Sequence, residues 1–226
     1  MNNNKKYLVA TIIAVVFHLI CLAGILFFGR TFFAQATSVN LWCMAMLLMV
    51  TQDNRTIGFW VFLIACFVTG ITAGIIGTST GVIFGNYIFG DVLGYKLAGV
   101  PLVIAANWFI IIYCCGVSMH TLLTRMLDKV SGGMPHPRPA LKLLSLVVDG
   151  ATLAVLLDFL IEPVAIKLGF WTWQGSIPVY NYVSWFIISS LLLLLFHILK
   201  FNKENKFAVN LFLIQGMFYL LLRTFL

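Results

Sequence analysis

Most of this sequence lies in seven apolar runs, each roughly 18 to 22 residues long. A helix that crosses a bilayer needs about 20 such residues. The 226 residues are 62% hydrophobic and only 9% charged, whereas soluble domains are about a quarter charged. The sequence therefore predicts an all-α integral membrane protein, a bundle of about seven transmembrane helices at 7–28, 32–50, 57–76, 100–119, 141–161, 182–199 and 207–225. No linker separates the runs, so residues 1–226 are expected to form a single transmembrane domain.

Basic residues in the short loops predict the orientation, because loops rich in lysine and arginine stay on the cytoplasmic side. With the N-terminus inside, four basic residues fall outside: Arg30, Lys96, Lys167 and Arg223. The other ten fall inside: Lys5, Lys6, Arg55, Arg125, Lys129, Arg138, Lys142, Lys200, Lys203 and Lys206. The bias favours a cytoplasmic N-terminus and an outside C-terminus, in a multi-pass protein of a cell membrane. The net charge of +7 is thus a topology signal, scattered rather than gathered, and no nucleic-acid partner is expected.

Two long, aromatic, glycine-rich loops fall on the same predicted outer side. They read GVIFGNYIFGDVLGYKLAGVP and IKLGFWTWQGSIPVY, and each leads into a helix that carries Asn and Trp in its first turns. These residues are Asn107 and Trp108 in one helix, and Asn181 and Trp185 in the other. We expect the two loop–helix units to converge in space.

Asp158 and Glu162 are the candidate catalytic residues that the pattern favours most. They are four residues apart in an apolar run, so on a helix they share one face. Carboxylates inside a membrane segment cost free energy and are more often functional than decorative. Two of them this close in a weakly solvated place cannot both ionise cheaply, which leaves one protonated and able to act as a general acid. The bland alternative is that Glu162, followed by Pro163, ends the helix while Asp158 pairs with a neighbouring helix.

Two further acids are weaker catalytic candidates. Asp149 lies nine residues before Asp158, about 13 Å away along a helix. There it is either functional or solvated and paired with Lys142 or Arg138. Asp91 lies in the first outer loop, where acids are common, although its aromatic neighbours make a site conceivable.

Trp171 and Trp173 have two interpretations. Tryptophan at the end of a membrane helix commonly belongs to an interfacial belt. Aromatic faces beside a buried acid also suit carbocation chemistry, because each ring stabilises a cation by roughly 0.5 to 2 kcal/mol. A metal site is not expected, since the four histidines are scattered along the chain: His18, His120, His136 and His197.

Two blocks of the sequence resemble the carotenoid biosynthesis proteins of the CruF type, which include bisanhydrobacterioruberin hydratase and γ-carotene hydratase. The first block is TGVIFGNYIFGDVLGYKLAGVPLVIAANWF (80–109), similar to the family's TG-x-x-FG-x-Y, LG-x-K-L-x-GVPL and Trp-Phe. The second is LLDFLIEPVAIKLGFWTWQGSIPVYNYVSWF (156–186), similar to its LD-x-x-x-(D/E)P, G-x-W-x-W and IP-x-x-N-x-x-x-W. Together they cover about a quarter of the chain.

The resemblance implies a cofactor-independent hydratase that adds water across the terminal double bond of an acyclic carotenoid ψ-end. Asp158 and Glu162 are then the acid and the water-orienting base, in an order that the sequence leaves open. The implied partners are an apolar carotenoid that enters laterally from the bilayer, the membrane lipids, and other carotenoid-pathway enzymes. The implied substrate-binding residues are Tyr87, Asn86, Asn107, Trp108, Trp171, Trp173, Asn181 and Trp185.

One position departs from the resemblance. The family pattern E-x-x-G-x-x-TG carries an acid where this chain has Gly74, in Gly74-Ile75-Ile76-Gly77. Two other function classes therefore stay open. One is a non-catalytic subunit that binds carotenoid or lipid, for which Gly74 argues. The other is a proton-coupled transporter, which would show inverted repeats and helices broken at the midplane.

Overall fold

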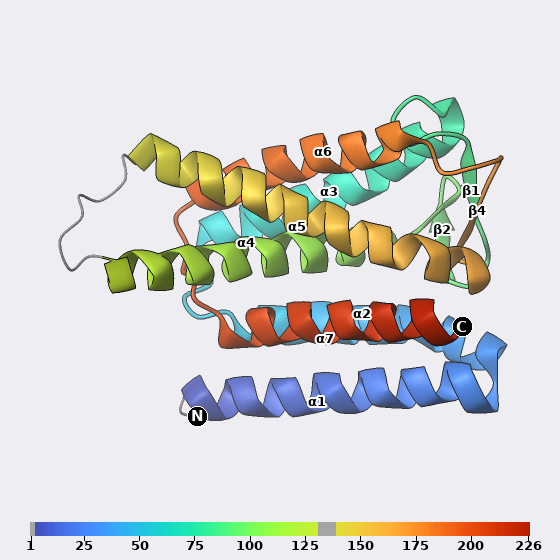
Figure 1. The fold of residues 1–226 in the computed structure, drawn as a ribbon, viewed down its shortest axis with the longest axis horizontal. Coiled ribbons are helices and arrows are strands. Elements are labelled where there is room, and N and C mark those ends of the chain that lie inside the picture. Colours follow the sequence, from blue (N-terminus) through green and yellow to red (C-terminus); the bar gives the residue numbers. More distant parts are fainter. Residues whose placement is uncertain (1–2, 131–138) are drawn as a thin grey trace.

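A computed structural model describes residues 3–130 and 139–226 of the chain (Figure 1). Seven helices in this described part are long and apolar enough to cross a membrane, so the predicted multi-span, all-α membrane class is confirmed. Arg138 and His136 lie outside the described residues. The helices are α1 (Asn3–Ala23, followed by a π-helical turn at Gly24–Phe28), α2 (Arg30–Thr51), α3 (Ile57–Thr80), α4 (Val103–Val130), α5 (Pro139–Lys167), α6 (Val179–Ile198) and α7 (Lys206–Phe225).

Several helices run beyond the apolar runs that predicted them, and α3 shows why. It continues to Thr80 because hydroxyls bond to carbonyls of the preceding turn: Thr78 Oγ1 donates to Gly74 O at 2.9 Å and Ser79 Oγ to Ile75 O at 2.7 Å. Polar residues thus extend the helix without free hydroxyls. It ends at Gly81, whose φ of +67° is a left-handed conformation that glycine adopts readily.

Helix α4 occupies the centre of the bundle. In Figure 1, α3, α5 and α6 lie on one side of it, and α1, α2 and α7 on the other. In the apolar 18-residue stretch of α4, 83% of the stretch is buried inside the bundle. The corresponding share in the other six helices is between 28% and 39%. Between helices in lipid the hydrophobic effect is weak and close packing carries the association. Gly70 allows α3 to pack closely against α4, because a Cβ at this position would lie 2.8 Å from the ring of Trp108 in α4.

The described residues include four short strands, which lie at one end of the bundle that we call the strand end. Strand β1 (Tyr87–Phe89) pairs antiparallel with β4 (Trp171–Trp173), and β2 (Lys96–Leu97) pairs with β3 (Val100–Pro101). Because β1 comes from the first long loop and β4 from the second, the predicted convergence of these loops is confirmed. The strands themselves were not predicted, since three residues are too few for a periodic pattern.

The two chain ends lie at opposite ends of the bundle, with the C-terminus at the strand end (Figure 1). Most basic residues of the predicted inner side lie at the other end, which we call the basic end. It carries Lys5, Arg55, Arg125, Lys200 and Lys206, which all fall near a helix terminus there. Which end faces the cytoplasm stays a prediction.

Helix α5 continues past Pro163 to Lys167, so the alternative in which Glu162-Pro163 ends the helix is wrong. A proline inside a helix has no N–H for the carbonyl four residues earlier, which here belongs to Phe159. Arg223 of α7 supplies the missing donor: its Nη1 lies 2.7 Å from Phe159 O, and its guanidinium stacks 4.3 Å from the centre of the Phe159 ring. The arginine thereby lets α5 carry Asp158 and Glu162 as successive turns of one helix.

Because Arg223 donates to the carbonyl that Pro163 leaves without an N–H, substitutions at Pro163 and Arg223 should have non-additive effects on the free energy of unfolding. Arg223→Met is expected to lower the free energy of unfolding by about 1 to 2 kcal/mol, because it leaves a carbonyl without a donor. In a Pro163→Ala background the helix regains its own N–H, so the same substitution should cost clearly less. Thermal unfolding of the four proteins in a mild detergent measures this double-mutant cycle. Equal costs in both backgrounds would show that Arg223 acts through the Phe159 ring alone.

Candidate active site

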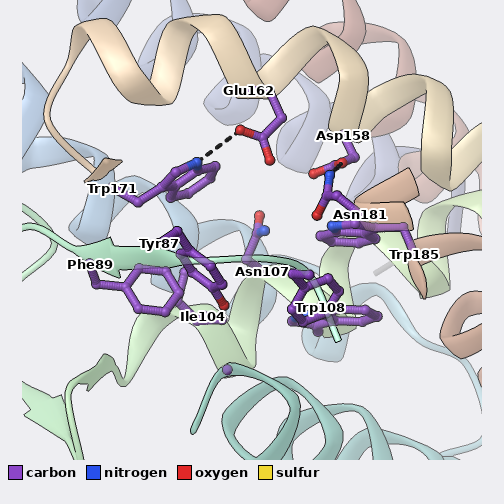
Figure 2. Close-up of a pocket in the computed structure, with 12 residues that line it drawn as sticks. Tyr87, Phe89, Ile104, Asn107, Trp108, Asp158, Glu162, Trp171, Asn181 and Trp185 are labelled. Carbon is purple, nitrogen blue, oxygen red and sulfur yellow. Dashed lines mark hydrogen bonds between the residues drawn. The ribbon is translucent and has the colours of Figure 1, made fainter. Parts of the chain in front are cut away.

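A buried pocket lies at the strand end, inside the bundle, where α3, α4, α5 and α6 meet the β1–β4 pair. Figure 2 shows two carboxylates above it and aromatic rings around it. Its free space of about 50 Å³ is enough for a water molecule. The lining residues are Gly74, Phe84, Tyr87, Phe89, Ile104, Asn107, Trp108, Asp158, Glu162, Trp171, Asn181 and Trp185.

The two carboxylates come from one face of α5, one turn apart, and both are only 2% exposed. Asn181, at the start of α6, lies beside Asp158, with its Nδ2 3.3 Å from Asp158 Oδ2. Because Asn181 is itself 1% exposed, water has little access to this contact. Neither acid has an ion-pair partner within 4 Å among the described residues. The pair is thus held in the interior by neutral groups.

Glu162 is held by the two tryptophans of β4. Trp171 Nε1 donates to Glu162 Oε2 at 2.9 Å, as Figure 2 shows, and Trp173 Nε1 donates to the same oxygen at 3.0 Å. Residues two apart on a strand point to the same side, so both indoles reach one carboxylate. Pairing of β4 with β1 fixes this strand, with Tyr87 opposite Trp173. Two donors on one oxygen stabilise the ionised form of a carboxylate.

In an enzyme that works through this pocket, the two hydrogen bonds to Glu162 predict a graded effect on the turnover number. Trp171→Phe and Trp173→Phe each keep an aromatic ring but remove one donor, so each should lower the turnover number about tenfold, as expected for about 1.4 kcal/mol. The double variant should lose clearly more, because no donor remains on Oε2. Product formation per mole of protein, with Trp42→Phe on the outer face of α2 as the control, measures this. Unchanged turnover in the double variant would mean that the indoles only pack.

Aromatic rings form the walls of the pocket opposite the acids. Trp108 of α4 stacks on Trp185 of α6, with ring centroids 4.2 Å apart and planes 2° from parallel. Tyr87 lies 5.1 Å from Trp173. Burial, together with the neighbouring acid pair, raises the pKa of the Tyr87 hydroxyl well above its usual range. Tyr87 therefore stays neutral and can donate a hydrogen bond at any physiological pH.

Six of the eight predicted substrate-binding residues line the pocket, and two do not. Trp173 lies behind the lining and acts through Glu162. Asn86 is exposed, and its backbone carbonyl accepts from Gln174 N at 2.8 Å, which extends the β1–β4 pairing. Phe84 and Ile104 line the pocket although the sequence did not single them out. Nothing in a single sequence separates them from ordinary apolar packing residues.

Asp91 and Asp149, the two weaker catalytic candidates, lie outside the pocket. Asp91 is exposed and pairs with Lys96 at 2.7 Å, and this hydrogen bond and charge lower the pKa of its carboxyl. Asp149 lies on the exposed surface of α5, where it accepts a hydrogen bond from Ser145 Oγ at 2.6 Å. Asp149 lies nine residues before Asp158 on α5, about two and a half helical turns. It therefore lies on the opposite face of the helix.

Gly74 lines the pocket from α3. A Cβ at this position would lie 2.8 Å from Val100 Cγ1, so the valine of β3 occupies the space that a side chain on α3 would need. The position where the family pattern carries an acid therefore faces the same pocket as Asp158 and Glu162. In this chain it contributes no polar group.

Fold and site together define a multi-pass membrane protein with a buried, aromatic-walled pocket that holds two carboxyl groups. Comparison with protein families identifies it further: the model for carotenoid biosynthesis proteins matches residues 32–226. The chain belongs to this family, and the predicted resemblance is confirmed. No curated protein and no solved structure matched the chain.

Proposed function

We propose that the protein is a carotenoid hydratase, which adds water to the terminal C=C of an acyclic ψ-end group and gives a tertiary alcohol. The observation that carries this proposal is the buried pair Asp158 and Glu162 in an aromatic pocket, in a member of the carotenoid biosynthesis family. An alkene has no lone pair to activate, so its hydration needs a strong proton donor that is kept from bulk water. A buried carboxyl group supplies one.

Hydrogen bonding supports an assignment of the two roles. Glu162 accepts from two indole N–H groups, which favour its ionised form. Asp158 has one longer contact with the Asn181 amide, and of the two acids it is the better candidate to be protonated. In this proposal Asp158 is the general acid and Glu162 is the base that orients and deprotonates water.

The reaction then balances without a cofactor. The Asp158 proton adds to the less substituted alkene carbon, and the positive charge develops on the tertiary carbon. The faces of Trp108 and Trp185 stabilise this cation. Water attacks it and gives its proton to Glu162. Transfer of that proton back to Asp158, one turn away on α5, restores the starting state.

The surroundings of the reaction follow from the same proposal. An elongated apolar substrate lies in the bilayer and enters between helices, so the site needs no wide aqueous mouth. The membrane is the cell (inner) membrane of a bacterium or archaeon, with the N-terminus inside as the basic residues predict. Other enzymes of the carotenoid pathway are the expected protein partners.

A non-catalytic carotenoid-binding subunit is the second candidate, and one observation favours it. Gly74 and Val100 fill the part of the pocket where the family pattern carries an acid. In such a protein the aromatic pocket would hold an end group without changing it. The buried Asp158 and Glu162 argue against a role in binding alone, because binding a hydrocarbon needs no carboxyl group.

Expression in cells that accumulate lycopene, followed by mass spectrometry of the extracted carotenoids, tests the proposal. A hydratase yields carotenoids heavier by one or two waters. Lycopene that stays unchanged, while the protein is folded in the membrane and retains lycopene on purification, would support the binding subunit instead.

A further inference from the structure

A second hollow is lined by residues near the end of α4 and the start of α7. These helix ends lie at the basic end of the bundle, opposite the strand end that holds the candidate active site (Figure 1). Its volume is about 620 Å³, which is much larger than the free space of about 50 Å³ in the pocket that Asp158 and Glu162 line. It is lined by polar side chains of both helices, among them His120, Thr121, Arg125, Lys206 and Asn210, and ends at Leu213.

The hollow carries an excess of positive charge. Arg125 and Lys206 line it against one carboxylate, Glu204. No carboxylate lies within 4 Å of Arg125 or Lys206 in the described part of the chain. The Lys206 ammonium donates to the neutral amide oxygen of Asn4 at 3.1 Å, so its charge is not cancelled. A ligand that fits this lining carries an anionic, hydrogen-bond-accepting group.

An apolar groove continues from this hollow toward the middle of the membrane. It runs between α1 and α7, has a volume of about 270 Å³ and exposes no polar surface. Leu213 lines both spaces. Along α7, Lys206, Asn210, Leu213 and Met217 follow one another at intervals of three or four residues, so they form one stripe on the helix. Leu213 and Met217 are 59% and 55% exposed on this stripe.

The polar hollow and the apolar groove together match the two parts of a phospholipid. Leu213 lies about 10 Å deeper along α7 than Lys206, which is the direction from the headgroup region into the hydrocarbon core. Basic pockets between transmembrane helices are suited to anionic lipid headgroups. A free phosphate would occupy the polar hollow alone and would leave the apolar groove empty.

We propose that an anionic phospholipid binds here, with its phosphate at Arg125 and Lys206 and an acyl chain along the α1–α7 groove past Leu213. The site is separate from Asp158 and Glu162, and its test does not depend on catalysis. The lipid would hold α1, α4 and α7 together at the basic end.

The test compares binding of phosphatidylglycerol and phosphatidylcholine with identical chains to the full-length protein in a neutral detergent, by native mass spectrometry. The wild-type protein is expected to prefer the anionic lipid at least tenfold. Each cation near such a lipid is worth about a fivefold gain, so Arg125→Gln/Lys206→Gln should lower phosphatidylglycerol affinity about 20- to 30-fold. The matched control is Arg55→Gln/Lys200→Gln, which removes two exposed charges of the same end outside the hollow. It should change the affinity less than twofold.

A second variant keeps every charge and tests the groove. Leu213→Trp fills the junction between the two spaces, so it should weaken phosphatidylglycerol at least tenfold while leaving binding of inorganic phosphate unchanged. The lipid assignment is overturned if Arg125→Gln/Lys206→Gln binds phosphatidylglycerol like the wild type. It is also overturned if inorganic phosphate at equal concentration displaces the lipid, which would indicate a phosphate site. Should the double charge variant fail to fold, the Leu213→Trp result decides alone.

Discussion

Asp158→Asn is expected to lower the hydration rate by about a hundred- to ten-thousandfold, the range that general acid catalysis contributes. The asparagine has the same shape and keeps the contact with Asn181, but it has no proton acidic enough for an alkene. Because the substitution removes a buried carboxyl group, folding should be unaffected or slightly improved. The expected result is thus a well-folded, inactive protein.

The measurement is tertiary alcohol formed per mole of membrane-inserted protein, with thermal unfolding recorded on the same sample. Asp149→Asn is the matched control, since it makes the same chemical change on the exposed surface of the same helix. It should keep activity within twofold of the wild type. Full activity in Asp158→Asn would move the acid to another residue.

Glu162→Gln should have an effect of similar size, for a different reason. Glutamine can still accept from Trp171 and Trp173 through its amide oxygen, so the strand β4 should stay in place. It cannot take the proton from water as the C–O bond forms, and the loss is again about a hundred- to ten-thousandfold.

The control for Glu162→Gln is Asp91→Asn, which removes an exposed acid at the same end of the bundle and should leave the rate within twofold. If Glu162→Gln were fully active while Asp158→Asn was inactive, a single acid would suffice and water would need no base. The two indole N–H groups on Glu162 would then serve folding alone.

The sequence predicted those features of the structure that depend on residues a few positions apart. The apolar runs predicted the seven long helices found in the described part of the chain, because a bilayer crossing imposes its length on each of them. The spacing of Asp158 and Glu162 predicted their shared helix face for a similar reason. These statements need only residues a few positions apart, and no knowledge of how the helices pack.

Contacts between residues far apart in the sequence could not be predicted from local patterns of residues. The β1–β4 pairing, which puts Trp171 and Trp173 on Glu162, joins residues more than 80 positions apart. The role of Arg223, 60 positions after Pro163 in the sequence, became visible only once α7 lay beside α5. The sequence alone leaves Asp91 and Asp149 as catalytic candidates for the same reason, since their exposure depends on neighbours that a single sequence does not reveal.

In the proposed reaction an alkene is protonated and the resulting cation is captured by water. Isotope labelling tests it most directly: membranes containing the protein and lycopene are incubated without cofactors in D₂O, and in parallel in H₂¹⁸O. The proposed reaction gives one non-exchangeable deuterium on carbon in D₂O, and one ¹⁸O in H₂¹⁸O, for each new hydroxyl group. A hydroxyl group whose oxygen comes from O₂, or a product without carbon-bound deuterium, would contradict it.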